Sequence, residues 1–152
     1  MPTAIRSDAQ ASGYQLKGGG PSLYEQYWVP AIMGLCAADL TESACLREGE
    51  KVLDVACGTG VVARTVAKFF GGDQASIAGI DINDIMLDTA RRQADMEGID
   101  NIDWQIGDAS QLPFKASSFE VALCQQGLQF MPDPTHLQVG FFTCTDPTSK
   151  TA

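Results

Sequence analysis

The sequence predicts an α/β protein, a three-layer sandwich of helices on a mainly parallel sheet that is shortened to about four or five strands. Short runs of β-branched and aliphatic residues alternate with stretches whose apolar residues recur at helical spacing, a pattern typical of parallel strands joined by right-handed crossovers. In addition, Asp54, Asp81 and Asp108 recur at intervals of 27 residues, the period of one strand-helix unit.

Length and composition indicate one domain. The 152 residues, of which 45% are hydrophobic, suffice for one buried core and are too few for two ordinary domains. Residues 1–20 are small, polar and glycine-rich, so they bury too little surface to offset the entropy lost on ordering. We therefore expect a flexible tail over 1–20, a domain over 21–147 and a short tail over 148–152.

Charge and cysteine content exclude several classes of partner. The net charge of −9 gives no broad basic field for nucleic acid or for an anionic membrane surface, and no run approaches the roughly 20 apolar residues of a membrane span. The five cysteines are odd in number and widely spaced, with no CxxC pair and no histidine cluster. They indicate reduced thiols in a cytoplasmic protein and no structural zinc or other metal site.

The elements follow in order along the chain. Apolar residues at helical intervals predict two short helices from Pro21 to about Leu46, with Pro30 as the break between them. Strands are then expected at 51–56, 75–82 and 119–126, with a third strand and its loop at 101–109. Helices are expected at 60–70, ended by two glycines, and at 83–98, begun by the N-cap residue Asn83.

The first strand leads into the glycine loop "DVACGTG" at 54–60. Gly58 and Gly60 allow a sharp turn and close approach of a ligand to the backbone, and the next helix presents unpaired N–H groups. With Ala63 the loop also fits GxGxxA, the pattern of dinucleotide sites. The loop alone therefore fits a pyrophosphate, a smaller cofactor, or a tight turn without a ligand.

Further acids follow the second and third strands, where ligands of parallel sheets bind. Asp81 lies 21 residues after Gly60, at the distance expected for a carboxylate that binds both ribose hydroxyls; the alternative is a helix cap, a role that Asn83 can already fill. Asp108 beside Ala109 suits a carboxylate and a backbone N–H that together recognise adenine, or else a simple turn residue.

These features together resemble a known family. "VLDVACGTG", "GIDIN" with Met86, "GDASQLPF" and "FEVALCQQGLQFMPD" are similar, in order and spacing, to four motifs of class I methyltransferases that use S-adenosylmethionine. The resemblance is greatest to the small-molecule group related to ubiquinone and menaquinone biosynthesis methyltransferases, and it spans Tyr24 to Pro134. It implies a Rossmann-like fold, S-adenosylmethionine as the cofactor and a small apolar molecule as the methyl acceptor.

The resemblance also implies roles for individual residues. Asp54 and the backbone around Ala56, Gly58 and Gly60 would hold the methionine ammonium and carboxylate, and Asp81 the ribose hydroxyls. The remaining implied contacts are the adenine faces for Ile82 and Met86, the adenine edge for Asp108 and Ala109, and the methionyl group or acceptor pocket for Gln125 and Gln126. A carboxylate at Asp54 suits a ligand ammonium better than a pyrophosphate, which weakens the dinucleotide interpretation.

The aromatic group before the core and the lone histidine have open roles. Tyr27 could contact the sulfonium through a cation–π interaction or shape an apolar acceptor site, whereas we expect Trp28 to pack its helix onto the sheet. Methyl transfer from a sulfonium relies on alignment and exclusion of water, so no nucleophile is obligatory. We expect no catalytic role for His136, the sole histidine.

The sequence departs from the family after Pro134. Only a fifth strand at 137–145 is suggested there, so we expect a chain truncated at its C-terminus, with an incomplete acceptor pocket and an unprotected sheet edge near the first and fourth strands. Such an edge pairs with another chain, which predicts a homo-oligomer. The alternatives to methyl transfer are a cofactor-binding fragment without turnover, or a hydrolase or NAD-dependent redox activity in a reshaped pocket.

Overall fold

The structure is a computed structural model that describes residues 18–71 and 76–131. Most of the predicted N-terminal tail, the suggested fifth strand at 137–145 and His136 lie outside the described residues. Gly20, which we expected to belong to the tail, already begins a helix.

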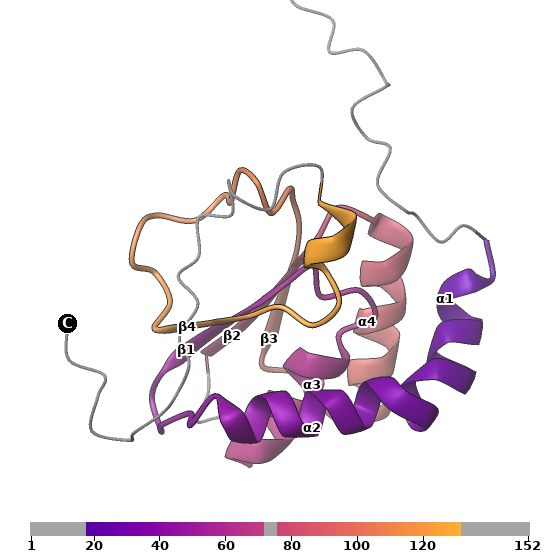
Figure 1. Ribbon diagram of the computed structural model, residues 1–152, viewed down its shortest axis with the longest axis horizontal. Coiled ribbons are helices and arrows are strands. Elements are labelled where there is room, and N and C mark those ends of the chain that lie inside the picture. The colour runs from indigo at the N-terminus through magenta and orange to yellow at the C-terminus, as the bar shows by residue number, and fades with distance from the viewer. Residues whose placement is uncertain (1–17, 72–75, 132–152) are drawn as a thin grey trace, which may run out of the picture.

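One parallel sheet forms the centre of the described structure (Figure 1). Its strands are β1 (Lys51–Val55), β2 (Ser76–Asp81), β3 (Ile102–Ile106) and β4 (Val121–Leu123), arranged in the order β3-β2-β1-β4. Asp54 on β1 is opposite Gly79 on β2 and Leu123 on β4. Because the chain proceeds outward from β1 to β3 and then crosses back to β4, the strand order reverses at β1, where ligands of such sheets bind.

Two helices follow the first two strands as predicted. Helix α3 (Val61–Phe70) begins after Gly60 and ends at Gly71, both in the left-handed conformation. Helix α4 (Asp84–Met96) begins at Asn83, whose side chain accepts a hydrogen bond of 3.1 Å from the N–H of Ile85. The predicted N-cap at Asn83 is therefore confirmed.

The N-terminal segment is one continuous helical run, which we call the cap helix. It consists of α1 (Gly20–Leu23), the π-helix η2 (Tyr24–Met33) and α2 (Gly34–Ser43). The predicted break at Pro30 is wrong, because Pro30 lies inside the π-helix, whose wider turns accommodate a residue that lacks an N–H. At the end of the π-helix Gly34 donates its N–H to the carbonyl of Val29.

The two faces of the sheet are covered differently. On one face the aliphatic residues of the strands pack against helix residues. These are Ala37 of the cap helix and Val62 and Val66 of α3. On the other face the partly buried residues come from the segment after β3, among them Leu112, Phe114 and Phe119. A short 3₁₀-helix, η3 (Leu128–Phe130), follows β4. Within the part of the chain that the structure describes, no helix combines the length and apolar character required to cross a membrane.

A buried ion-pair network fastens the cap helix to the core. The guanidinium of Arg64 on α3, which is 4% exposed, pairs with Glu25 of the cap helix at 2.7 Å and with Glu97 at the end of α4. Lys68 adds a bond of 2.9 Å to Glu97. The network thus links the cap helix to α3 and to the end of α4.

Candidate functional site

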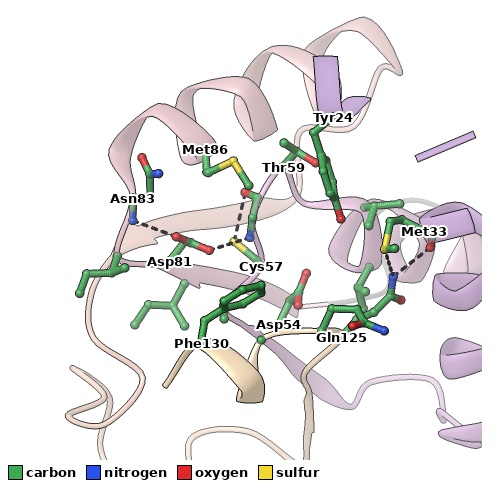
Figure 2. Close-up of a pocket in the computed structure, with 18 of the residues that line it drawn as sticks. Tyr24, Met33, Asp54, Cys57, Thr59, Asp81, Asn83, Met86, Gln125 and Phe130 are labelled. Atoms are coloured by element: carbon green, nitrogen blue, oxygen red, sulfur yellow. Dashed lines mark hydrogen bonds between the residues drawn. The ribbon is translucent and has the colours of Figure 1, made fainter. Parts of the chain in front are cut away.

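A cavity of about 610 Å³ opens at the carboxyl ends of the strands (Figure 2). Its volume lies in the range of about 300 to 1,000 Å³ that is typical of small-molecule sites. Its walls come from the cap helix, the glycine loop, the ends of the strands and η3. The predicted contact residues that line it are Tyr27, Asp54, Ala56, Gly58, Asp81, Ile82, Met86, Asp108, Ala109, Gln125 and Gln126.

The glycine loop has two kinds of glycine. Gly58 lines the cavity with a φ of 56°, and a Cβ at this position would lie 3.3 Å from the side chain of Met86. Gly60 is not among the lining residues; a Cβ there would lie 2.3 Å from the Trp104 ring and 3.1 Å from Ala90. The glycine at 60 is thus required by packing against β3 and α4, a reason that the sequence motif does not reveal.

Asp81 connects the glycine loop to the beginning of α4. Its carboxylate accepts hydrogen bonds of 2.8 Å from the N–H groups of Gly58 and Asn83. Burial raises the pKa of Asp81, and the same two N–H groups oppose this rise. Asp81 does not itself cap α4, because Asn83 does so, but it holds the two loops that border the cavity in place.

Asp54 lies at the base of the cavity and is only 1% exposed. One carboxylate oxygen accepts a hydrogen bond of 3.0 Å from the N–H of Ala63 in the first turn of α3. Burial raises the pKa of Asp54 to about 7; the bond from Ala63 opposes this rise and the nearby Asp81 adds to it. The site therefore contains two neighbouring carboxyl groups that are poorly hydrated.

Asp108 occupies the turn after β3. Its carboxylate accepts hydrogen bonds from the backbone N–H and the hydroxyl of Ser110, at 2.8 and 2.7 Å. This is the geometry of the turn residue that we considered as the alternative. Asp108 and Ala109 nevertheless line the cavity, as Ile82 and Met86 also do.

Two consecutive glutamines close the cavity at the end of β4. Gln125 donates from Nε2 to the carbonyl oxygen of Met33, at 3.0 Å, and so ties β4 to the cap helix. Gln126 has a φ of 58°, a left-handed conformation that is uncommon for a residue with a side chain. Ala56, which also lines the cavity, shares this feature with a φ of 54°. Backbone strain of this kind gathers at functional sites.

Aromatic side chains surround the mouth of the cavity. Tyr27 and Trp28 are 60% and 55% exposed, so the expectation that Trp28 packs its helix onto the sheet is wrong. Figure 2 shows Tyr24 reaching from the cap helix with its hydroxyl directed into the cavity, and Phe130 entering from η3. Burial, followed by the nearby acids Glu25 and Asp54, raises the pKa of Tyr24.

Several features of the site escaped the sequence analysis. Thr59 Oγ1 and Gln125 Oε1 are buried atoms of residues that line the cavity, and they have no hydrogen-bond partner among the described residues. The spacing of Glu25 and Arg64 gives no signal of their ion pair, because it joins helices that are distant in sequence. Thr59 lies inside the glycine loop that the sequence motif identified. The motif does not reveal that this side chain is buried.

A parallel sheet whose order reverses at its first strand, with a glycine loop and strand-end acids around a cavity, defines a Rossmann-like cofactor-binding domain of the class I methyltransferase type. The profile of the family described as "Methyltransferase domain" matches residues 52–140. The chain belongs to this family, which confirms the predicted S-adenosylmethionine-dependent methyltransferase fold and its cofactor.

Individual relatives agree with this assignment. The chain is 35% identical over 101 residues to the aklanonic acid methyltransferase DauC of Streptomyces sp. strain C5, a match that covers 66% of this chain and 44% of that protein. It is 27% identical over 122 residues to a ubiquinone biosynthesis O-methyltransferase of Coxiella burnetii, covering 76% of this chain and 50% of that protein. The chain thus spans about half the length of these relatives.

A solved structure supports the fold independently of sequence. The crystal structure of a SAM-dependent methyltransferase from Aquifex aeolicus superposes with a TM-score of 0.67, at 18% identity, over 81% of this chain and 64% of that one. The predicted Rossmann-like, mainly parallel sheet is therefore confirmed, with four strands among the described residues.

Proposed function

We propose that the protein transfers a methyl group from S-adenosylmethionine to a small, apolar acceptor with an aromatic or quinone-like ring. The observation that carries this proposal is the cavity itself, in which a glycine loop, three strand-end aspartates and an aromatic mouth meet. The acceptor class is supported by the half-exposed Tyr27, Trp28 and Phe130 at the mouth, and by relatives named for aklanonic acid and ubiquinone biosynthesis.

The chemistry of the residues that line the cavity supports S-adenosylmethionine as the ligand. Two oxygen acceptors suited to a ligand ammonium belong to residues that line the cavity. They are the buried carboxyl group of Asp54 and Gln125 Oε1, which has no hydrogen-bond partner among the described residues. Asp81 would bind the ribose hydroxyls, Ile82 and Met86 the adenine faces, and Asp108 with Ala109 the adenine edge. Gly58 and Ala56 would leave the backbone open to the methionyl carboxylate, and Gln126 would border the acceptor.

For methyl transfer the protein has to do little more than align the acceptor with the methyl group. When bound, S-adenosylmethionine supplies a methyl group that its sulfonium already activates. Tyr24 and the aromatic mouth would exclude water and hold the acceptor in line with that methyl group. An acceptor hydroxyl that ionises readily needs no strong base, which suits a described lining without histidine or lysine.

The test is product formation with a matched pair of variants. The full chain is incubated with S-adenosylmethionine and a panel of phenolic and quinol acceptors, and S-adenosylhomocysteine is quantified together with cofactor binding by calorimetry. We expect turnover, and a loss of cofactor affinity of about tenfold or more in Asp81→Asn, because a hydrogen bond to a carboxylate is lost. Asp103→Asn, an exposed change on β3 outside the cavity, should behave as wild type.

Each other outcome has a distinct meaning. Cofactor binding without turnover on any acceptor would support the alternative of a cofactor-binding fragment. Preferential binding of NADH would instead favour a redox activity and contradict the proposal.

The setting and assembly of the protein are part of the same proposal. We propose a cytoplasmic homo-oligomer that makes no contact with nucleic acid, on the basis of the net charge of −9, the free thiols of Cys36, Cys57 and Cys124, and the position of β4 at an edge of the described sheet. Light scattering at micromolar concentration should detect the oligomer, and a stable monomer would refute it.

A further inference from the structure

Among the described residues, the titratable groups whose charges are coupled to the carboxyl group of Asp54 are all acids. The side chain of Asp54 is 1% exposed and accepts a hydrogen bond from the N–H of Ala63. Besides burial, the negative charge of Asp54 raises the pKa of three of these groups, and that of Asp81 raises the pKa of Asp54. The groups come from four parts of the fold: Tyr24 of the cap helix, Cys57 of the glycine loop, Asp81 of β2 and Cys124 after β4. None of these groups can supply a positive charge.

The rest of the described cavity does not supply a cation either. Its ionisable carboxyl groups are Asp54, Asp81 and Asp108, and none of the described lining residues is a lysine, arginine or histidine. Two of the arginines that lie elsewhere in the described fold are paired with acids. Arg64 is engaged by Glu25 and Glu97 on the helical side. Arg91 on α4, whose charge acts to lower the pKa of Cys57, is 41% exposed and pairs with Asp88. A buried carboxylate without a cationic partner is costly, and such a group keeps its proton instead.

Two further atoms indicate that a polar ligand is expected at this place. Thr59 Oγ1 and Gln125 Oε1 are buried against the cavity and lack hydrogen-bond partners among the described residues, and Thr59 is itself 1% exposed. Buried polar atoms are normally satisfied, so a ligand that reached these two atoms would supply the hydrogen bonds that they lack.

We propose that Asp54 is protonated in the ligand-free protein near neutral pH and gives up this proton to solvent when the cationic cofactor binds beside it. The inference rests on the proposed function, because the cation is supplied by S-adenosylmethionine. The positive charge of the ligand replaces the proton as the partner of the carboxylate. Cofactor affinity then rises with pH, by up to about tenfold per pH unit, until the carboxyl group of the free protein is itself ionised near pH 7.

The experiment counts the protons released on binding. The full chain is titrated with S-adenosylmethionine by calorimetry at pH 6.5, in two buffers that differ in ionisation enthalpy. This pH lies below the range of about 7.7 to 8.0 in which the ligand's own α-amino group ionises. We expect a buffer-dependent enthalpy that corresponds to the release of protons on binding, because a group with a pKa of about 7 is still largely protonated at this pH.

Two variants assign the proton to its residue. Asp54→Asn keeps an oxygen that can accept from Ala63 but has no proton to release, so the buffer dependence should vanish. Asp95→Asn, an exposed carboxylate on α4, should retain it. If Asp54→Asn does not fold, the affinity of the wild-type chain between pH 5.5 and 8 tests the same point: a rise below pH 7 supports the inference, and a flat profile refutes it.

The results separate this inference from the function on which it rests. Absence of S-adenosylmethionine binding would refute the proposed function, and the proton exchange with it. Binding with the same enthalpy in both buffers, or proton release that persists in Asp54→Asn, would refute the proton exchange and leave the proposed function standing.

Discussion

At the scale of single residues, the glycines of the loop have different physical reasons to be glycine. Gly58 borders the cavity and has a Cβ position only 3.3 Å from Met86. Gly60 is confined by the Trp104 ring, whereas Gly71 has a similar left-handed backbone and, apart from its chain neighbours, no atom of the described residues within 4 Å of its Cβ position. The motif therefore combines a ligand-facing position with a packing position, and the two can be separated by mutation.

Gly60→Ala should destabilise the protein more than Gly71→Ala. Both changes place a side chain in the left-handed region, at a cost of roughly 1 to 2 kcal/mol. Only the first also drives a methyl group into Trp104, for which overpacking adds about 1 to 3 kcal/mol. Urea denaturation measures the difference, and equal losses for the two variants would contradict the packing role of Gly60.

Asp54 should make the stability of the ligand-free protein depend on pH. Its pKa is about 7 in the folded chain and near 4 when unfolded, so the folded state binds more protons between these values. Its contribution to the free energy of unfolding is therefore present at low pH and is lost as the pH rises from about 4 to about 7.

Asp54→Asn removes this loss, because an amide does not ionise. The melting temperature of the variant relative to wild type should rise between pH 5 and pH 8, whereas Asp95→Asn should show no such trend. A difference between Asp54→Asn and wild type that stays constant over this range would show that Asp54 is ionised in the folded protein throughout.

At the scale of elements, the cap helix packs against the core through apolar residues and is also joined to it by polar contacts. It carries the exposed Tyr27 and Trp28 of the cavity mouth, and two polar links fasten it: Glu25 to Arg64 and the carbonyl of Met33 to Gln125. Removing one partner of a buried ion pair leaves an uncompensated charge, whereas exposed pairs contribute little. The cap helix should thus respond strongly to changes at Arg64.

Arg64→Met should destabilise the protein by about 3 to 5 kcal/mol, because Glu25 is left buried and unpaired. Arg91→Met, which removes the exposed pair with Asp88, should cost less than about 1 kcal/mol. Denaturation curves give both values, and hydrogen exchange should show faster exchange over the cap helix in Arg64→Met. Similar small losses in the two variants would contradict the anchoring role.

Elements with a local sequence signal could be predicted, and contacts between distant segments could not. The helices at 61–70 and 84–96 follow from their periodicity, from Asn83 and from the glycine at 71. At Pro30 the local rule predicted a break, but a π-helix keeps the run helical. The Arg64 network depends on how three helices meet, which no single segment of sequence records.

At the scale of the whole molecule, the sheet order explains why the predicted residues meet. β1, β2 and β3 bring Asp54, Asp81 and Asp108 to one end of the sheet, and β4 adds Gln125 beside β1. The carboxyl ends of parallel strands meet at one end of the sheet, so the motif spacing sufficed to predict that these residues lie close together. Exposure of Trp28 and the proton-binding environment of Asp54 required the packed structure, because both depend on what the cap helix covers.

Equilibrium dialysis of the full chain with labelled S-adenosylmethionine, alone and in the presence of excess NADH, tests the central claim most directly. The cavity described above predicts saturable binding of one cofactor per chain that NADH does not displace. Displacement by NADH, or no saturable binding of S-adenosylmethionine, would contradict the account.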